Sequence, residues 1–141
     1  MNENAISQIQ EKSVENSFNA LIVDDYFLIR HNFRLLLANM GISITEAKNG
    51  QEALDLLLRY EPKSFSFIIV DLSMPVMNGD EFIARARHIY KDNLPPILVC
   101  SSSSEMPEIK KVISLGINGY IIKPVDFKSF KAKIQELIPE L

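Results

Sequence analysis

The 141-residue sequence has little of several features that would each have indicated a particular class of protein. Its single cysteine, Cys100, excludes a disulfide framework and suits a reducing compartment. No apolar run approaches the roughly 18 residues of a membrane-spanning helix, and the first residues lack the basic and apolar regions of a secretory signal. The net charge of -3 provides no basic surface for nucleic acid. We therefore expect a cytoplasmic protein that binds neither membranes nor nucleic acids.

Glycine is also scarce, and its placement argues against a nucleotide site. The five glycines form neither a G-x-G-x-x-G nor a P-loop pattern, the two arrangements that cradle nucleotide phosphates. What is present is a hydrophobic fraction of 47%, which in a chain of this length supports the core of one ordinary domain. The sequence therefore favours a single globular domain that works without a bound nucleotide.

Residues 1–17 differ from the rest of the chain. They are mostly Asn, Gln, Glu, Ser and Lys, a composition that buries too little apolar surface to offset the entropy of ordering. We expect a mobile polar arm over residues 1–17 and a folded domain over residues 18–141. Because Ile6 and Ile9 stand at helical spacing, a short helix that docks on a partner is the alternative for the arm.

From residue 18 onward, short apolar runs alternate with longer segments of helical periodicity. The runs predict five strands, at residues 20–23, 42–47, 67–70, 97–100 and 120–122. Apolar side chains recur three and four positions apart after most of these runs and predict five helices, which are marked by these residues: Ile29, Phe33, Leu36 and Met40; Ala53, Leu54, Leu57 and Leu58; Phe82, Ile83, Ala86 and Ile89; Ile109, Val112, Ile113 and Leu115; Phe127, Phe130, Ile134, Leu137 and Leu141. Five strand–helix units in strict alternation predict an α/β fold, a parallel sheet with helices on both faces.

Polar residues stand where four of the predicted strands end. Asp24 and Asp25 follow the first strand, Asp71 the third, Ser101 the fourth and Lys123 the fifth. Because parallel strands bring their carboxyl ends to one edge of the sheet, we expect these side chains to converge there. Three close carboxylates repel one another and raise one another's pKa, a penalty that Mg²⁺ removes by binding their oxygens. With an ammonium and a hydroxyl beside them, they suit the transfer of a phosphoryl group to an aspartate.

Four segments around these residues resemble the motifs of one family, the receiver (REC) domain of two-component response regulators. The segments are L-I-V-D-D at 21–25, I-V-D-L-S-M-P-V-M-N-G at 69–79, P-I-L-V-C-S at 96–101 and G-Y-I-I-K-P at 119–124. The resemblance covers residues 18–141. It implies a flavodoxin-like three-layer sandwich, in which a doubly wound five-stranded parallel sheet of order 2-1-3-4-5 is covered by five helices.

The resemblance also implies a role for each site residue. Asp71 would accept a phosphoryl group from a phosphohistidine on a sensor histidine kinase or a histidine phosphotransfer protein. Ser101 and Lys123 would contact the phosphoryl oxygens. The ligands of Mg²⁺ would be Asp24, Asp25, Asp71 and the backbone carbonyl of Ser73.

A conformational switch is implied as well. Ser101 would shift on phosphorylation and Tyr120 would swing inward, although packing in the core is the commoner role of such a tyrosine. The peptide bond between Lys123 and Pro124 would be cis, which an X-Pro bond permits at low cost. The fourth helix, fifth strand and fifth helix would form the face that meets a downstream target protein. Lysines in this part of the sequence suit an acidic partner, and solvated helix faces would look the same.

We therefore expect a stand-alone, phosphorylation-dependent signalling switch of a two-component or phosphorelay pathway. It would assist its own phosphoryl transfer and dephosphorylation and would not otherwise be an enzyme. Two alternatives stay open: a receiver-fold binding module that acts without phosphorylation, and the receiver piece of a hybrid histidine kinase. A haloacid-dehalogenase-type phosphatase fits less well, because Ser73 stands where that family carries a second aspartate.

Overall fold

The computed structural model describes residues 17–141, so the arm predicted over residues 1–17 lies outside the described residues apart from Ser17. Along the described chain, five strands and five α-helices alternate, as the sequence predicted, and a short 3-10 helix was not foreseen. The elements are β1 (Phe18–Val23), α2 (Phe27–Ala38), β2 (Ile42–Ala47), α3 (Gly50–Arg59), η1 (Pro62–Ser64), β3 (Phe67–Val70), α4 (Gly79–Tyr90), β4 (Ile97–Ser101), α5 (Met106–Ser114), β5 (Gly119–Ile122) and α6 (Phe127–Leu137).

The strands form one parallel sheet in the order β2-β1-β3-β4-β5, which confirms the predicted strand order. The register places the ends of neighbouring strands level with one another. Val23, the last residue of β1, pairs with Ala47 at the end of β2 and with Val70 at the end of β3. Val70 pairs in turn with Val99 in β4. The residues that follow these strands therefore emerge along one edge of the sheet.

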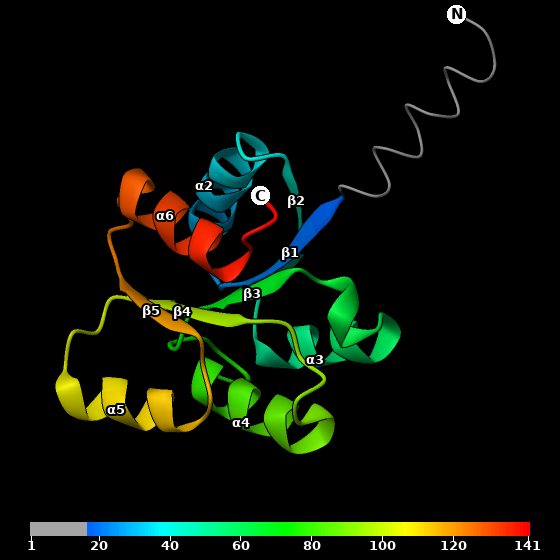
Figure 1. Ribbon diagram of the computed structural model, residues 1–141. Coiled ribbons are helices and arrows are strands. Elements are labelled where there is room, and N and C mark those ends of the chain that lie inside the picture. Colours follow the sequence, from blue (N-terminus) through cyan, green and yellow to red (C-terminus); the bar gives the residue numbers. More distant parts are fainter. Residues whose placement is uncertain (1–16) are drawn as a thin grey trace, which may run out of the picture.

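Helices cover both faces of the sheet, which gives the predicted three layers (Figure 1). On one face, α2 and α6 pack through side chains such as Phe33 and Phe130, whose rings lie 5.4 Å apart. On the other face, α3, α4 and α5 contribute Leu57, Phe82 and Val112 to a second cluster. Every residue of β3 and β4 is buried, as expected for central strands of a sheet that is covered on both sides. No helix in residues 17–141 has both the length and the apolar character needed to cross a membrane.

Four of the apolar residues that marked the predicted helices do not lie in the core. Leu58, Ile89, Ile113 and Phe127 are 82%, 59%, 54% and 41% exposed. Each helix packs on the sheet through a single stripe, and the residue next to a buried one is turned away by roughly 100° around a helix of 3.6 residues per turn. Leu58 therefore points to solvent although its neighbour Leu57 is buried.

The helix α2 differs from the prediction in another way, because one of its buried residues is charged. Its buried residues are Arg30, Phe33 and Leu37, whereas the predicted Ile29 and Leu36 are only half-buried. The buried stripe thus keeps Phe33 but passes through Arg30 and Leu37, the neighbours of Ile29 and Leu36. Arg30 ends beside the carboxyl end of β1, where the sequence placed the functional residues.

Candidate functional site

The acidic residues lie together at the edge of the sheet. Asp24 follows β1 and Asp71 follows β3, two strands that pair directly. The chain leaves β1 for β2 on one side and reaches β3 on the other, so this is the point where the strand order reverses and where such sheets bind ligands. Carboxylate oxygens of Asp24, Asp25 and Asp71 all lie within 4.8 Å of one another. Such a set of hard oxygen donors fits Mg²⁺.

Every polar atom of Asp24 has a hydrogen-bond partner. Its N–H donates to the carbonyl of Ala47 at 3.1 Å, and its own carbonyl accepts from Arg30 at 2.7 Å. Its Oδ1 accepts from the N–H of Tyr26 at 2.9 Å, and its Oδ2 accepts from Nζ of Lys123 at 2.8 Å. The residue is 2% exposed. Asp24 is therefore fixed in place by β2, by the start of α2 and by Lys123.

Lys123 is the cation of the site. Its Nζ lies 2.8 Å from Oδ2 of Asp24 and 3.6 Å from Oδ2 of Asp71. Burial by itself would lower the pKa of Lys123, but the hydrogen bond and charge of Asp24 and the charge of Asp71 outweigh it, so the pKa is raised. The ammonium therefore stays protonated and bridges two of the three carboxylates.

The surroundings of Asp71 disfavour the ionised form of its carboxyl group. Burial raises the pKa of its carboxyl, and the charge of Asp24 adds to this effect. The charge of Lys123 and the backbone N–H groups of Ser73 and Leu72 act in the opposite direction, yet the pKa remains above its ordinary value. The backbone N–H of Asp71 donates to the carbonyl of Val23 at 2.9 Å, which fixes the residue to β1. Asp71 thus has a buried, firmly placed carboxylate whose ionisation the surroundings oppose.

The loop after Asp71 lies close against it. The N–H of Gly79 donates to the carbonyl of Leu72 at 2.9 Å, and a Cβ on Gly79 would lie 2.1 Å from the carbonyl oxygen of Asp71. Only glycine allows this approach. Val76, in the same loop, is 81% exposed and has a φ of 66°, a region that β-branched residues avoid. Such backbone strain is concentrated at functional sites.

Hydrogen bonds connect the predicted residues Ser101, Tyr120 and Lys123 on the β4–β5 side. Ser101 is the last residue of β4 and is buried, and its Oγ accepts from the N–H of Ser103 at 3.3 Å. The hydroxyl of Tyr120 in β5 donates to the carbonyl of Ser103 at 2.8 Å. The N–H of Lys123 donates to the carbonyl of Ser101 at 2.8 Å. The loop after β4 is therefore tied to both Ser101 and Tyr120.

The other predicted residues are readily placed. Ser73 is exposed in the loop after Asp71. The peptide bond between Lys123 and Pro124 is cis, the isomer that the resemblance implied. Cys100 is a free, buried cysteine in β4, and burial raises the pKa of its thiol to about 12. Cys100 therefore serves as a small buried residue of the core.

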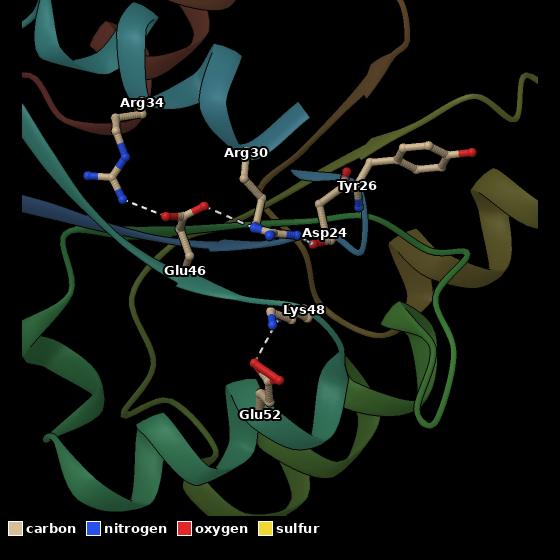
Figure 2. A network of polar contacts seen from close by, with 7 residues as sticks. All are labelled: Asp24, Tyr26, Arg30, Arg34, Glu46, Lys48 and Glu52. Atoms are coloured by element: carbon tan, nitrogen blue, oxygen red, sulfur yellow. Dashed lines mark hydrogen bonds and ion pairs between the residues drawn. The ribbon is translucent and has the colours of Figure 1, made fainter. Parts of the chain in front are cut away.

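Sequence reasoning missed one polar network beside the acidic residues, which Figure 2 shows. The guanidinium of Arg30 reaches from α2 to Glu46 in β2 and to the carbonyl of Asp24. Arg34, one turn further along α2, holds the other oxygen of Glu46 at 2.5 Å. One feature of the sequence could have indicated this network. Arg30 stands three residues before the apolar Phe33, and a helix places residues at this spacing on the same face.

The chain thus forms a five-stranded parallel sheet that carries three carboxylates where its strand order reverses, and Lys123 contacts two of them. These features define a class of α/β proteins with an acidic, oxygen-rich site. Comparison with known proteins identifies the class more closely. The model of the response regulator receiver domain matches residues 20–135, and the chain belongs to this family.

Several individual proteins are similar to the chain. The chemotaxis protein CheY-3 of Vibrio cholerae is 29% identical over 93% of this chain and 99% of its own length. The chemotaxis protein CheY of Pseudomonas aeruginosa is 30% identical over 83% of this chain and 93% of its own. The solved structure of CheY4 from Vibrio cholerae superimposes with a TM-score of 0.77 at 27% identity, covering 86% of this chain and 99% of that one. The solved structure shares the fold class that was predicted from the sequence.

Proposed function

We propose that this protein is a phosphorylation-dependent switch of a two-component or phosphorelay pathway and that Asp71 is its phosphoacceptor. One observation carries the proposal: the buried carboxylate of Asp71 lies at the switch point of a receiver-family sheet, with two further carboxylates and an ammonium beside it. The cytoplasmic location expected from the sequence is part of the proposal.

The reaction is a phosphoryl transfer from a partner's phosphohistidine. A carboxylate oxygen of Asp71 forms a bond to phosphorus while the phosphorus–nitrogen bond breaks, and the imidazole leaves with the electron pair and takes up a proton. The ammonium of Lys123 lies 3.6 Å from Oδ2 of Asp71, and its charge opposes the rise in the pKa of Asp71 that burial and Asp24 cause, so it favours the ionised carboxylate that acts as the nucleophile. Lys123 neutralises charge on the phosphoryl oxygens, and the hydroxyl of Ser101 donates a hydrogen bond to one of them. This is catalysis by positioning and charge, as in other phosphoryl transfers.

Asp24, Asp25, Asp71 and the carbonyl of Ser73 would hold Mg²⁺. Three carboxylates within 4.8 Å are more negative charge than one lysine balances, and their oxygens are the donors that this ion prefers. When bound, the ion supplies positive charge next to the transferred group. Lys123, which is itself held by Asp24, lies beside Asp71 at 3.6 Å and helps to keep its carboxylate in place.

The output of the switch follows from the contacts of the β4–β5 side. Phosphorylation draws Ser101 toward the phosphoryl group, which disturbs the loop that Tyr120 holds through Ser103. The surface of α5, β5 and α6 changes with that loop and is the face offered to a downstream target. The upstream partner is a sensor histidine kinase or a histidine phosphotransfer protein. Beyond its own phosphorylation and dephosphorylation the protein carries out no further reaction.

The proposal is tested by the intact mass of the protein after incubation with acetyl phosphate. We expect one added phosphoryl group in the presence of Mg²⁺ and none without the ion. Asp71→Asn should take up none, whereas Asp55→Asn, at an exposed carboxylate on α3, should behave as the unmodified protein. If neither acetyl phosphate nor beryllofluoride modifies the protein, a receiver-fold binding module that works without phosphorylation replaces the proposal.

A further inference from the structure

Arg30 is a charged residue in an unusual place. Its side chain is 7% exposed and lies between α2 and the sheet. Removing a guanidinium from water carries a large cost unless its donors are matched by acceptors. All buried side-chain nitrogen and oxygen atoms of the described residues do have partners. The partners of Arg30 therefore indicate what its burial achieves.

Two contacts account for the position of the guanidinium (Figure 2). Its Nε donates to Oε1 of Glu46 at 2.9 Å, and its Nη1 donates to the backbone carbonyl of Asp24 at 2.7 Å. Glu46 lies in β2 and pairs in register with Ile22 of β1, two residues before Asp24. Arg30 thus connects the edge strand to the carboxyl end of β1, where the acidic pair begins.

The carbonyl that Arg30 holds belongs to the peptide group between Asp24 and Asp25. Because a peptide group is planar, fixing its oxygen fixes the direction in which the chain continues to Asp25. The side chain of Asp25 is exposed and takes part in no hydrogen bond or ion pair with residues 17–141. Only the backbone therefore keeps its carboxylate within 4.8 Å of the other two.

A simpler interpretation is that Arg30 merely joins α2 to β2 through Glu46. Arg34 already makes that connection, because it pairs with Oε2 of the same carboxylate at 2.5 Å from the next turn of α2. Arg34 is about half exposed, and no hydrogen bond or ion pair joins it to Asp24 in residues 17–141. The carbonyl contact is thus the feature that distinguishes the buried arginine from its exposed neighbour.

We propose that Arg30 is the positioning residue of the acidic pair: held by Glu46, it fixes the Asp24–Asp25 peptide so that both carboxylates stay within 4.8 Å of Asp71, where they would hold Mg²⁺. This inference rests on the proposed function, since Arg30 would position the ligands of the same metal site without binding the ion itself. Residues that orient metal ligands without touching the metal have large effects on affinity. Arg30 plays this part through a backbone carbonyl rather than through a ligand side chain.

The test is the dissociation constant for Mg²⁺, measured by calorimetry on the folded proteins at a temperature well below their unfolding transitions. Arg30→Met, which keeps the apolar stem and removes the donors, should raise this constant by about tenfold or more, the effect typical of an outer-shell partner. Arg34→Met is the matched control, because it also removes a partner of Glu46, and it should leave the constant within about twofold of the unmodified protein. Phosphorylation of Arg30→Met by acetyl phosphate should recover when the Mg²⁺ concentration is raised to saturation.

The outcomes separate the possible failures. If Arg30→Met lowers only the unfolding temperature and binds Mg²⁺ as tightly as the unmodified protein, the inference is wrong. It is also wrong if Arg34→Met weakens binding as much as Arg30→Met. Should Arg30→Met not fold, Arg30→Met combined with Glu46→Gln leaves no unpaired charge in the interior and must show the same weakened binding. Failure of the unmodified protein to bind Mg²⁺ would instead overturn the proposed function.

Discussion

At the scale of single residues, the carboxylates of the site outnumber the ammonium group that contacts them. Three carboxylates share the edge of the sheet, and Lys123 is the cation that bridges two of them. Its ammonium lies nearer to Asp24 than to Asp71, at 2.8 Å against 3.6 Å. Lys123 therefore neutralises part of the same charge that attracts a divalent ion. The lysine and the ion act on the same carboxylates, so each weakens the attraction of the other.

This competition predicts the effect of removing the lysine. Lys123→Met should bind Mg²⁺ more tightly by about tenfold, the size of a one-unit effect of a neighbouring charge on an ionisable group. It should nevertheless be phosphorylated more slowly, because the phosphoryl oxygens lose a cation. Both effects are measured by Mg²⁺ titration and by the rate of mass increase with acetyl phosphate. Lys133→Met, which removes a lysine paired with Glu136 on α6, should change neither, and an unchanged or weaker affinity in Lys123→Met would contradict the argument.

At the scale of elements, α2 and β2 are joined by an ion-pair network rather than by apolar contacts alone. Glu46 receives hydrogen bonds from Arg30 and Arg34, and its side chain is about one-third exposed. Burial by itself would raise the pKa of Glu46, but the two arginines outweigh it and lower the pKa below its usual value of 4.5. The network therefore stabilises the fold only while the carboxylate is ionised.

The sign of this linkage gives a pH prediction. Because the pKa of Glu46 is lower in the folded protein, its contribution is complete above about pH 5 and is lost as the pH falls through the folded-state value. Glu46→Gln should therefore lower the free energy of unfolding by about 1.5–3 kcal/mol at pH 7, the range for hydrogen bonds to charged groups. The difference between the two proteins should shrink steadily between about pH 5 and pH 3 in urea titrations. In contrast, Glu136→Gln, in an exposed pair on α6, should change the stability little at any of these pH values.

At the scale of the whole molecule, folding brings carboxylates that repel one another together, and this lowers the stability of the domain at the site. The raised pKa of Asp71, caused first by burial and then by Asp24, shows that the folded state opposes the ionised carboxylate. A cation that binds the folded state alone recovers part of this loss, because ligand binding shifts the folding equilibrium by mass action. Stability and ligand binding are thus coupled through the whole domain.

We expect Mg²⁺ to raise the unfolding temperature. At about ten times the dissociation constant the gain is roughly 1.4 kcal/mol, or about 3–6 °C for a domain of this size. The increase, followed by circular dichroism, should disappear in Asp25→Asn, whose exposed side chain contributes to the acidic cluster without supporting the fold. Asp55→Asn on α3 should keep the full increase. An equal increase in all three proteins would mean that the ion acts elsewhere.

Local patterns predicted most of the elements. Each predicted strand agrees with the observed one to within two residues, because apolar runs of a parallel sheet must be buried on both faces. Asp126 precedes the last helix, and its Oδ2 accepts the N–H of Ser129 at 3.0 Å, the N-cap contact that aspartate favours. The exposed Leu58 and Ile89 were not predicted, since a repeat of apolar residues does not tell which stripe of a helix meets the sheet.

The sequence by itself determined the alternation of strands and helices, the edge of the sheet at which polar residues gather and the identity of the acidic cluster. These follow from spacing along the chain and from the rule that parallel strands end on one side. Only the tertiary structure decided that Arg30 is buried, that it holds the carbonyl of Asp24, and that Lys123 lies between Asp24 and Asp71. The reason is physical: these contacts join residues from separate elements, and their strength depends on burial and distance, which exist only once the helices have packed on the sheet.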